Sequence, residues 1–310
     1  MRVLARAPAT SANLGPGFDV IGVALDLAYD EVEVELSGGE GVEIAVEGVE
    51  SESIPTDPSR NTAGLVATSI MSRFNVKARV KIRVKKGVPQ GVGLGSSAAS
   101  AAATAAALSR ALGLKLSSVE LIEEAARGEV ASSGVAHADN VAPSVLGGFA
   151  IVCSYSPLLV EKLMPPQNLE FALAIPLTVK KTTEKARSVL PKMIGLREHV
   201  DALASFSMLI MGIVKGDVQL IGRAMSLDKI VEAARAKIYP GFLKAKREAL
   251  KAGAAGVTLS GAGPTAIAAV DTRTTDAKLI AEVMKEAYEG EGVQCVAATS
   301  RPRASGVEVL

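Results

Sequence analysis

The sequence contains no tryptophan, and among its 310 residues there are only two histidines and two cysteines. Cys153 and Cys295 stand far apart, without the C-x-x-C spacing of metal and redox sites. Neither a zinc site nor a disulfide framework is therefore predicted. We expect both thiols to be buried as small apolar side chains.

An excess of charge of one sign is also missing. The chain has 34 basic and 33 acidic residues, which are interspersed and leave a net charge of +1. Proteins that bind nucleic acid or an anionic membrane surface usually carry a basic patch, so neither partner is expected. A small neutral or zwitterionic substrate suits this surface better.

Long apolar runs are absent as well. The longest, residues 98–108, is mainly alanine and falls short of the ~20 strongly apolar residues that a membrane span needs. Residues 1–6 lack the apolar segment of a secretion signal, so a cytoplasmic location is expected. With 48% hydrophobic and 22% charged residues, the chain is predicted to be globular and is long enough for two domains.

A glycine-rich loop leads directly into an alanine-rich helix. Glycines at positions 87, 91, 93 and 95 permit positive φ angles and leave backbone N–H groups accessible to an anion. The helix adds unpaired N–H donors and the positive end of its dipole. Ser96 and Ser97 fall in its first turn, where a hydroxyl can cap the helix or bind a phosphate-bound Mg²⁺. The pattern predicts a cradle for a triphosphate.

Two other nucleotide-binding motifs fit this loop poorly. Gly93, Gly95 and Ala98 satisfy the degenerate pattern G-x-G-x-x-G/A, but the acidic residue expected about 20 positions later in a dinucleotide site is missing. A Walker-type loop needs a Gly-Lys-Ser/Thr triplet, which does not follow these glycines. A glycine-rich turn that only feeds a packed helix stays open as an alternative for this segment.

Hydrophobic periodicity predicts an α+β chain. Alternation predicts strands at 30–36 and 80–84, and helical spacing predicts helices at 61–74 and 116–127. Further strands are predicted at 149–153, 171–175, 257–259, 265–270 and 293–298, with several helices before residue 251 and one at 276–288. Prolines at 157, 165 and 166 mark a domain boundary, which gives domains 1–165 and 166–310.

Residues 7–19 have an unusual composition. An ordinary core strand would not combine two prolines, two glycines, Thr, Ser and Asn in so short a span. We therefore expect a shaped loop that directs Asn13 and Asp19. A plain turn with an Asx cap is the alternative.

Two later segments also carry candidate residues. Residues 129–140 place Glu129, His137 and Asn140 among small side chains, although a lone histidine is more often structural than catalytic. Residues 258–265 form a third glycine turn between two predicted strands. Alone it fits any tight hairpin, and it would reach the same ligand only if the second domain folded over the first.

Together these segments resemble the GHMP kinases, the family of galacto-, homoserine, mevalonate and phosphomevalonate kinases. Residues 89–99, Pro-Gln-Gly-Val-Gly-Leu-Gly-Ser-Ser-Ala-Ala, are similar to the family's ATP loop, and residues 260–265, Ser-Gly-Ala-Gly-Pro-Thr, to its carboxy-terminal glycine motif. The similarity covers essentially the whole chain. It implies an amino-terminal domain like the second domain of ribosomal protein S5 and a ferredoxin-like carboxy-terminal domain, with the substrate between them.

Within the family, residues 7–19 and 137–143 look like those of the homoserine kinases. This resemblance implies ATP- and Mg²⁺-dependent phosphorylation of the side-chain hydroxyl of L-homoserine to O-phospho-L-homoserine, a step in threonine biosynthesis, by a homodimer. A family member that acts on mevalonate or a sugar remains an alternative. So does a non-catalytic nucleotide-binding protein on the same fold.

The resemblance also implies roles for single residues. Ser97 and Glu129 would hold Mg²⁺, and Asn61 would lie near the adenine. The rest of the nucleotide would contact Pro89, Gln90, Gly91, Val92, Gly93, Leu94, Gly95, Ser96, Ser97, Ala98 and Ala99.

For the amino acid, the resemblance implies that Asp19 pairs with the ammonium group and that Gly261 contacts the substrate. Arg187 and Arg235 would bind the carboxylate, for which the planar guanidinium is well shaped. Without the resemblance, both arginines would be interpreted as solvated helix charges.

Asn140 takes the position at which some family members have an aspartate that acts as general base. Asparagine cannot accept the hydroxyl proton, so Asn140 is expected to orient the hydroxyl, with Asn13 and His137 as its catalytic neighbours. Phosphoryl transfer depends mainly on positioning and charge neutralisation. The proton is therefore expected to leave late, to the transferring phosphate or to water.

Overall fold

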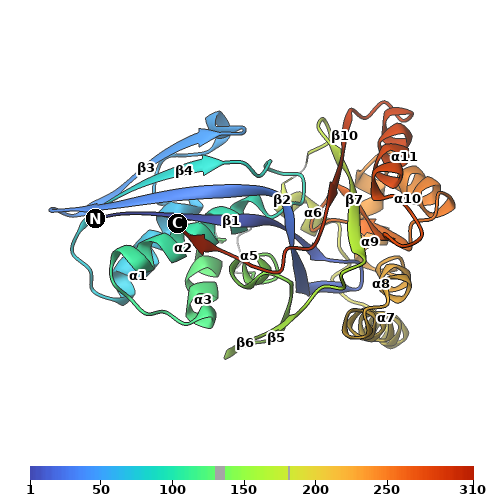
Figure 1. Ribbon diagram of the computed structural model, residues 1–310, viewed down its shortest axis with the longest axis horizontal. Coiled ribbons are helices and arrows are strands. Elements are labelled where there is room, and N and C mark those ends of the chain that lie inside the picture. The colour runs from blue at the N-terminus through green and yellow to red at the C-terminus, as the bar shows by residue number, and fades with distance from the viewer. Residues whose placement is uncertain (130–136, 181) are drawn as a thin grey trace.

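The computed structural model describes residues 1–129, 137–180 and 182–310, which form two lobes (Figure 1). In these residues the first lobe has a seven-stranded sheet. Five of its strands lie in the order β11-β1-β2-β4-β3, and β5 pairs with both β2 and β6. Its strands are β1 (Arg2–Asn13), β2 (Gly17–Ser37), β3 (Gly41–Gly48), β4 (Arg79–Lys86), β5 (Phe149–Tyr155), β6 (Leu158–Leu163) and β11 (Glu308–Val309). Only the pair of β3 and β4 is parallel among these described strands.

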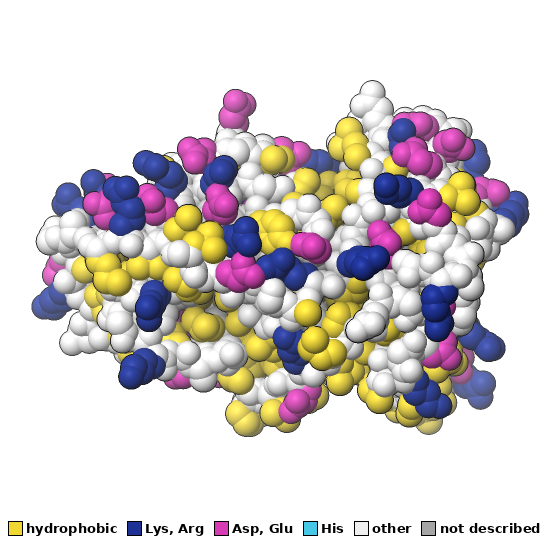
Figure 2. All heavy atoms as spheres, in the orientation of Figure 1, with side chains coloured by type: hydrophobic (Ala, Val, Ile, Leu, Met, Phe, Trp, Pro, Cys, Tyr) yellow, Lys and Arg dark blue, Asp and Glu magenta, His cyan; other side chains and the backbone are white. Residues whose placement is uncertain are grey.

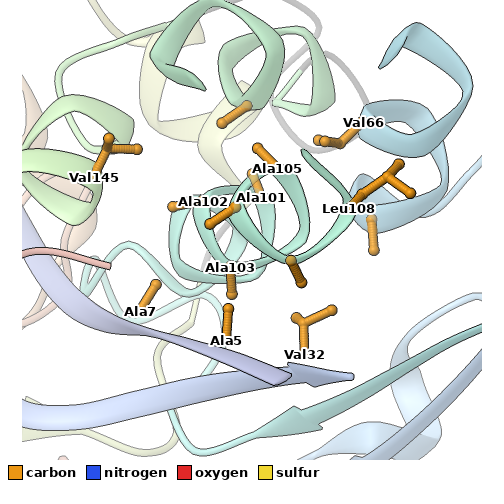
Figure 3. Close-up of a cluster of buried hydrophobic side chains, with 14 of the residues drawn as sticks. Ala5, Ala7, Val32, Val66, Ala101, Ala102, Ala103, Ala105, Leu108 and Val145 are labelled. Carbon is orange, nitrogen blue, oxygen red and sulfur yellow. The ribbon is translucent and has the colours of Figure 1, made fainter. Parts of the chain in front are cut away.

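One buried helix, α2, fills the centre of the first lobe. All of its residues except Ser97 and Arg110 are buried, as expected of a helix that is apolar on every side. Figure 3 shows Ala103 facing Ala5 on the sheet, with Val66 approaching from the opposite side. Alanine permits this close approach because its side chain is a single methyl group. The helices here are α1 (Thr62–Arg73), α2 (Ser96–Ala111), α3 (Ser118–Gly128) and α5 (Val141–Leu146), with a 3₁₀ turn at Ser51–Ser53.

The second lobe has a four-stranded antiparallel sheet in the order β10-β7-β9-β8 within the described residues. Its strands are β7 (Leu169–Pro176), β8 (Gly256–Leu259), β9 (Ala266–Asp271) and β10 (Cys295–Ser300). Its helices are α6 (Thr183–Ser188), α7 (Leu196–Lys215), α8 (Val218–Met225), α9 (Val231–Arg235), α10 (Phe242–Lys251) and α11 (Ala277–Glu289), with a 3₁₀ turn at Ala236–Ile238. The fourth, first, third and second strands lie side by side, which is the ferredoxin-like order.

The two lobes share an apolar core. Leu14, Ile21 and Leu94 of the first lobe belong to the same buried cluster as Phe171 and Met225 of the second. The chain also passes between the lobes twice. It enters the second lobe between β6 and β7, and the segment after β10 returns to the first sheet. There β11 pairs with β1, and the Arg6 guanidinium lies 2.9 Å from the Glu308 carboxylate.

The segment 7–19 differs from the expected loop. Residues 7–13 belong to β1, and only residues 14–16 form a turn. Pro8 is tolerated in the strand because the pairing with β2 is irregular there: Pro8 lies opposite Tyr29, but Thr10 lies opposite Ala24. The prediction of a loop over residues 7–13 was therefore wrong, although Asn13 and Asp19 do adopt the left-handed φ angles of 71° and 61°.

The expectation of two buried cysteines was wrong for Cys153, which is exposed, whereas Cys295 is buried. The apolar run at 149–153 suggests a strand buried on both faces. In the structure the hairpin of β5 and β6 lies beside α3 and α5, where Val152 is buried in the core, whereas the next residue, Cys153, lies on the opposite face of the strand and is exposed.

Figure 2 shows basic and acidic side chains interspersed over the face that it presents. Across residues 1–129, 137–180 and 182–310, no helix is long and apolar enough to cross a membrane.

Candidate active site

A cleft of about 1000 Å³ lies between the lobes. The glycine loop and the first turn of α2 line one side, and the turn at 261–263 lines another. The predicted substrate residues all contribute to the lining: Asn13, Asp19, His137, Asn140, Arg187, Arg235 and Gly261. The fold thus brings together segments that are far apart in the sequence.

The loop presents a row of backbone donors to this cleft. Gly91, Gly93 and Gly95 have φ angles of 66°, 83° and 67°. No acceptor among the described residues pairs with the main-chain N–H groups of residues 91–98. Helix α2 also starts without a side-chain cap, so the positive end of its dipole lies at the cleft. This arrangement suits the phosphates of a nucleotide.

The two serines at the start of α2 differ in their surroundings. The Ser96 hydroxyl donates to the Val88 carbonyl at 2.7 Å and so anchors the loop. Ser97 lies 2.9 Å from the Thr62 hydroxyl and also hydrogen-bonds the carboxylate of Glu129. Ser97, not Ser96, is therefore placed to bind a ligand beside Glu129.

A buried ion pair supports the loop from below. The Asp30 carboxylate pairs with the Lys86 ammonium group and also accepts the N–H groups of Gly87 and Val88, each at 3.0 Å. Lys86 donates further to the Ser96 carbonyl and to the Ser100 hydroxyl. All three ammonium hydrogens are used in this way, so Lys86 holds the loop and leaves phosphate binding to the backbone.

The third glycine turn packs directly against the loop. The Ser260 hydroxyl donates to the Gly93 carbonyl at 2.6 Å, and the Thr265 N–H donates to Val92. A Cβ on Gly93 would overlap the Ser260 carbonyl oxygen, so only glycine permits this approach. The Gly261 N–H is already used by the Ala12 carbonyl. The turn therefore braces the loop.

An ion pair spans the loop side of the cleft. Lys180, which follows β7 in the second lobe, pairs with Glu50 of the first lobe. The other oxygen of the Glu50 carboxylate accepts the Gln90 N–H at 3.0 Å. Burial acts to raise the pKa of Glu50, but its hydrogen bonds to Lys180 and Gln90 outweigh this and lower it.

Charged side chains gather away from the loop. The Arg187 guanidinium donates to the Asp19 carboxylate at 2.7 Å. Arg235 is almost fully buried and donates to the carbonyls of Ala186 and Gly261. Both guanidinium carbons lie over the Phe18 ring, at 5.2 and 5.4 Å from its centre. The arginines are thus held in place and are not solvated helix charges.

His137 completes this group. Its Nδ1 lies 3.8 Å from the Asp19 carboxylate, and its Nε2 is buried with no hydrogen-bond partner in the described part of the chain. Burial lowers the pKa of His137, Asp19 opposes this, and Arg187 adds to it. The neutral imidazole can therefore accept a hydrogen bond from a cationic group.

Asn13 connects the lobes. Its Nδ2 donates to the Gly261 carbonyl at 2.9 Å, and its Oδ1 accepts the Asp19 N–H at 3.0 Å. The Tyr155 hydroxyl fixes the Asp19 carbonyl from another side at 2.6 Å. Both ends of the Asn13 side chain are engaged, so it acts by holding Asp19 and the turn in position.

Asn140 lies between the loop and the charged group. Its Oδ1 accepts the Thr10 hydroxyl at 2.8 Å, and its N–H donates to the Asp139 carboxylate at 3.0 Å. Burial, reinforced by Asp19, raises the pKa of Asp139 to about 7.

Glu129 hydrogen-bonds Ser97 in the first turn of α2. Burial raises its pKa to about 7, although Ser97 and Lys86 act in the opposite direction. Across the described residues, no cluster of three His, Cys, Asp or Glu side chains could hold a metal by itself. One carboxylate with a hydroxyl is nevertheless the type of site that Mg²⁺ uses when substrate phosphates supply further ligands.

A second cavity of about 410 Å³ adjoins the loop and includes Asn61, Ser96 and Ser97 in its lining. Asn61 caps α1 through its Oδ1, which accepts the Ala63 N–H, and its Nδ2 donates to the Pro55 carbonyl. Asn61 thereby shapes one wall of this cavity.

Known proteins share this architecture. Residues 61–148 match the model of the GHMP kinases N terminal domain, and residues 209–290 match that of the GHMP kinases C terminal. A homoserine kinase of Methanococcus maripaludis is 42% identical over 261 residues, which cover 84% of this chain and 85% of that protein. The chain belongs to the GHMP kinase family.

Other relatives of this GHMP kinase cover more of it. A homoserine kinase of Halobacterium salinarum is 41% identical over 97% of this chain and 94% of its own length. The crystal structure of homoserine kinase from Cytophaga hutchinsonii superimposes with a TM-score of 0.93 at 38% identity, covering 100% of this chain and 97% of that one. The predicted two-domain fold is confirmed, and the family uses ATP as phosphoryl donor.

The sequence did not point to several side chains that build this GHMP kinase site. Phe18, Lys180 and the pair Asp30 and Lys86 all contact predicted site residues or the loop. Thr10 lies within the segment 7–19, which was predicted to be a loop that directs Asn13 and Asp19, and no role was predicted for Thr10 itself. Phe18 follows Gly17 at the start of β2, and nothing in that pattern indicates that two arginines lie over its ring.

The contact between the two glycine turns can be tested with Gly93→Ala. At Gly113, which has φ 69° and open space around it, the same change brings only the cost of a left-handed angle. We expect Gly113→Ala to lower the free energy of unfolding by about 1–2 kcal/mol and Gly93→Ala by about 3 kcal/mol or more, because only the latter creates an overlap.

Urea unfolding followed by circular dichroism measures both variants, since the chain has no tryptophan to report on unfolding. Gly93→Ala is also expected to weaken binding of a fluorescent ATP analogue, whereas Gly113→Ala is not. Equal losses of stability in the two variants would contradict the close packing of the loop against the turn.

Proposed function

We propose that this GHMP kinase transfers the γ-phosphoryl group of ATP to the side-chain hydroxyl of L-homoserine and forms O-phospho-L-homoserine for threonine biosynthesis. The observation that carries the proposal is the charged group in the cleft. Asp19 offers a carboxylate to an ammonium ion, with neutral His137 beside it, while Arg187 and Arg235 offer guanidinium groups to a carboxylate. An α-amino acid has both charged groups bonded to the same carbon. Mevalonate and sugars have no ammonium group.

ATP is proposed to lie along the loop. The N–H groups of residues 91–98 would hold its phosphates, and the cavity beside Asn61 would take the adenine. Lys180 is near enough to Gly91 to approach the phosphates from the second lobe.

Mg²⁺ is proposed to bind at Ser97 and Glu129. The geometry supports this assignment, because the Glu129 carboxylate is buried, hydrogen-bonds Ser97 and lines the cleft beside the loop. When bound, the cation would neutralise charge on the nucleotide phosphates. Ser97 keeps the carboxylate in place through its hydroxyl.

Asn140 is proposed to orient the substrate hydroxyl for attack. A new bond forms between the hydroxyl oxygen and the γ-phosphorus as the bond from that phosphorus to ADP breaks. The hydroxyl proton passes to the transferred phosphoryl group or to water. This sequence needs accurate positioning of the two substrates more than a strong base.

The function is tested by incubating the protein with ATP, MgCl₂ and a panel of alcohols. We expect phosphorus NMR to show a new phosphomonoester with L-homoserine and none with mevalonate or galactose, and we expect EDTA to abolish it. Phosphorylation of mevalonate instead would contradict the proposal. Binding of ATP without any phosphorylated product would favour a non-catalytic protein.

Asp19→Asn tests the ammonium contact. The variant keeps the size of the side chain but loses its charge, and a hydrogen bond to a charged group contributes about 1.5–3 kcal/mol, so KM for homoserine should rise about 10- to 100-fold. KM for ATP serves as the internal control and should change little. A similar rise in both KM values would show that Asp19 supports the fold of the cleft and not the amino group.

We also propose that the protein is a homodimer formed through α7. One side of this helix packs on α8, whereas its other side is largely exposed and lies at the lower right of Figure 2. That side has the alternating four- and three-residue spacing of a helix–helix seam. The residues at this spacing are Leu196, Val200, Leu203, Ser207, Ile210 and Val214.

Leu203→Glu is expected to shift the mass in analytical ultracentrifugation from about twice to once the chain mass of 31.8 kDa at micromolar concentration. Leu279→Glu on α11 is the matched control, because Leu203 and Leu279 are 55% and 54% exposed. A wild-type protein that sediments as a monomer would refute the proposed dimer.

The location is proposed to be the cytoplasm. Cys153 and Cys295 are both free thiols, as is usual in a reducing compartment. ATP, the phosphoryl donor, is also a cytoplasmic metabolite.

A further inference from the structure

Thr10 occupies the point where three parts of the site meet. It is fully buried in β1, away from the surface of the cleft. Its N–H donates to the Leu94 carbonyl of the glycine loop at 3.0 Å, and its hydroxyl donates to Asn140 Oδ1 at 2.8 Å. One residue therefore holds both the phosphate loop and the side chain that faces the substrate.

This contact determines how the Asn140 amide is oriented. Asparagine often caps the helix that it precedes, and Asn140 precedes α5, but its side chain makes no capping hydrogen bond there. Its oxygen is instead engaged by Thr10. The oxygen and the Nδ2 group of the amide point in different directions from the same carbon. With the oxygen bound to Thr10, the Nδ2 group is left for the cleft that Asn140 lines.

Gly95 explains why the contact can form. It is the residue before α2, and a Cβ there would overlap the Thr10 hydroxyl and come within 3.2 Å of Asn140 Oδ1. The absence of a side chain at position 95 lets the loop lie directly on the pair of Thr10 and Asn140. Thr10 thus positions both the loop and the Asn140 amide.

We propose that Thr10 is a positioning residue for phosphoryl transfer, an inference that rests on the proposed function. By holding Asn140 Oδ1, it presents Nδ2 as a donor to the oxygen of the substrate hydroxyl. That hydrogen bond fixes the oxygen and leaves it a lone pair to form the bond to the γ-phosphorus while the bond to ADP breaks. The hydroxyl proton points away from Asn140 and passes to the transferred phosphoryl group or to water. A reversed amide would present an oxygen that cannot take this proton.

The test compares Thr10→Val, Thr10→Ser and the control Thr104→Val. Valine has the shape of threonine but cannot donate a hydrogen bond, whereas serine can. Thr104 is equally buried, and its hydroxyl donates to the Ser100 carbonyl within α2, away from the substrate. Thermal unfolding of all variants separates loss of stability from loss of rate.

We expect Thr10→Val to lower kcat with homoserine about 10- to 100-fold, the loss typical of a misplaced group, with KM for ATP within about twofold of wild type. Thr10→Ser should restore most of the rate. Thr104→Val should lower stability without this loss of kcat. If Thr10→Val keeps the wild-type kcat, or if Thr104→Val loses as much, the proposal is overturned.

A double-mutant cycle with Asn140→Ala tests the coupling. If Thr10 acts through Asn140, adding Thr10→Val to Asn140→Ala should cause almost no further loss of kcat. Losses that multiply would show that Thr10 acts independently of Asn140, which would overturn the inference.

The amide contact can also be followed without activity. Five asparagine and four glutamine residues give a sparse set of side-chain amide signals in a ¹⁵N spectrum, and Asn140→Ala assigns the one of interest. This signal should shift in Thr10→Val and not in Thr104→Val. Wild-type protein that makes no phosphohomoserine would defeat the proposed function, whereas an Asn140 signal unchanged by Thr10→Val would defeat the contact.

Discussion

The site depends on one buried carboxylate. Asp30 accepts hydrogen bonds from two backbone N–H groups at the start of the glycine loop, and from Ser100 and Lys86 on its other oxygen. A buried ion pair is costly unless the remaining donors and acceptors of both partners are satisfied, and here both are. Because Lys86 also binds the Ser96 carbonyl, the same network holds the entry of the loop and the first residue of α2. The N–H groups of residues 91–95, which lie between these two anchors, are left for a ligand.

The end of the cleft that holds Asp19 and Arg235 depends on a different acceptor. The Gly261 carbonyl receives hydrogen bonds from Asn13 of the first lobe and from Arg235 of the second. Asn13 in turn fixes Asp19 through the Asp19 N–H. Asp19, proposed to bind the ammonium group, and Arg235, proposed to bind the carboxylate, are therefore held by the same turn. That turn also braces the loop through Ser260 and Gly93.

The sequence predicted the elements whose patterns are local. The alternating strands and the helix capped by Ser117 formed close to the expected positions, and the short motifs identified the family. The alternation of buried and exposed residues also indicated the buried ion pair of Asp30 and Lys86. Lys86 comes two residues after the buried Val84, and Asp30 two residues before the buried Val32, so each falls on the buried face of its strand. The arginines carried no such signal. Arg187 and Arg235 lie in helices of six and five residues, too short for a pattern to show a buried face.

The apolar cluster shared by the two lobes has a consequence for how the molecule holds together. Each lobe has a core of its own, but Leu94 beside the loop and Phe171 on β7 belong to a third cluster that residues of both lobes build. A piece cut after residue 165 would expose its share of that cluster to water and would also lose β11 from its sheet. The two lobes are therefore joined by a common apolar cluster, and unfolding of one lobe is expected to lower the stability of the other.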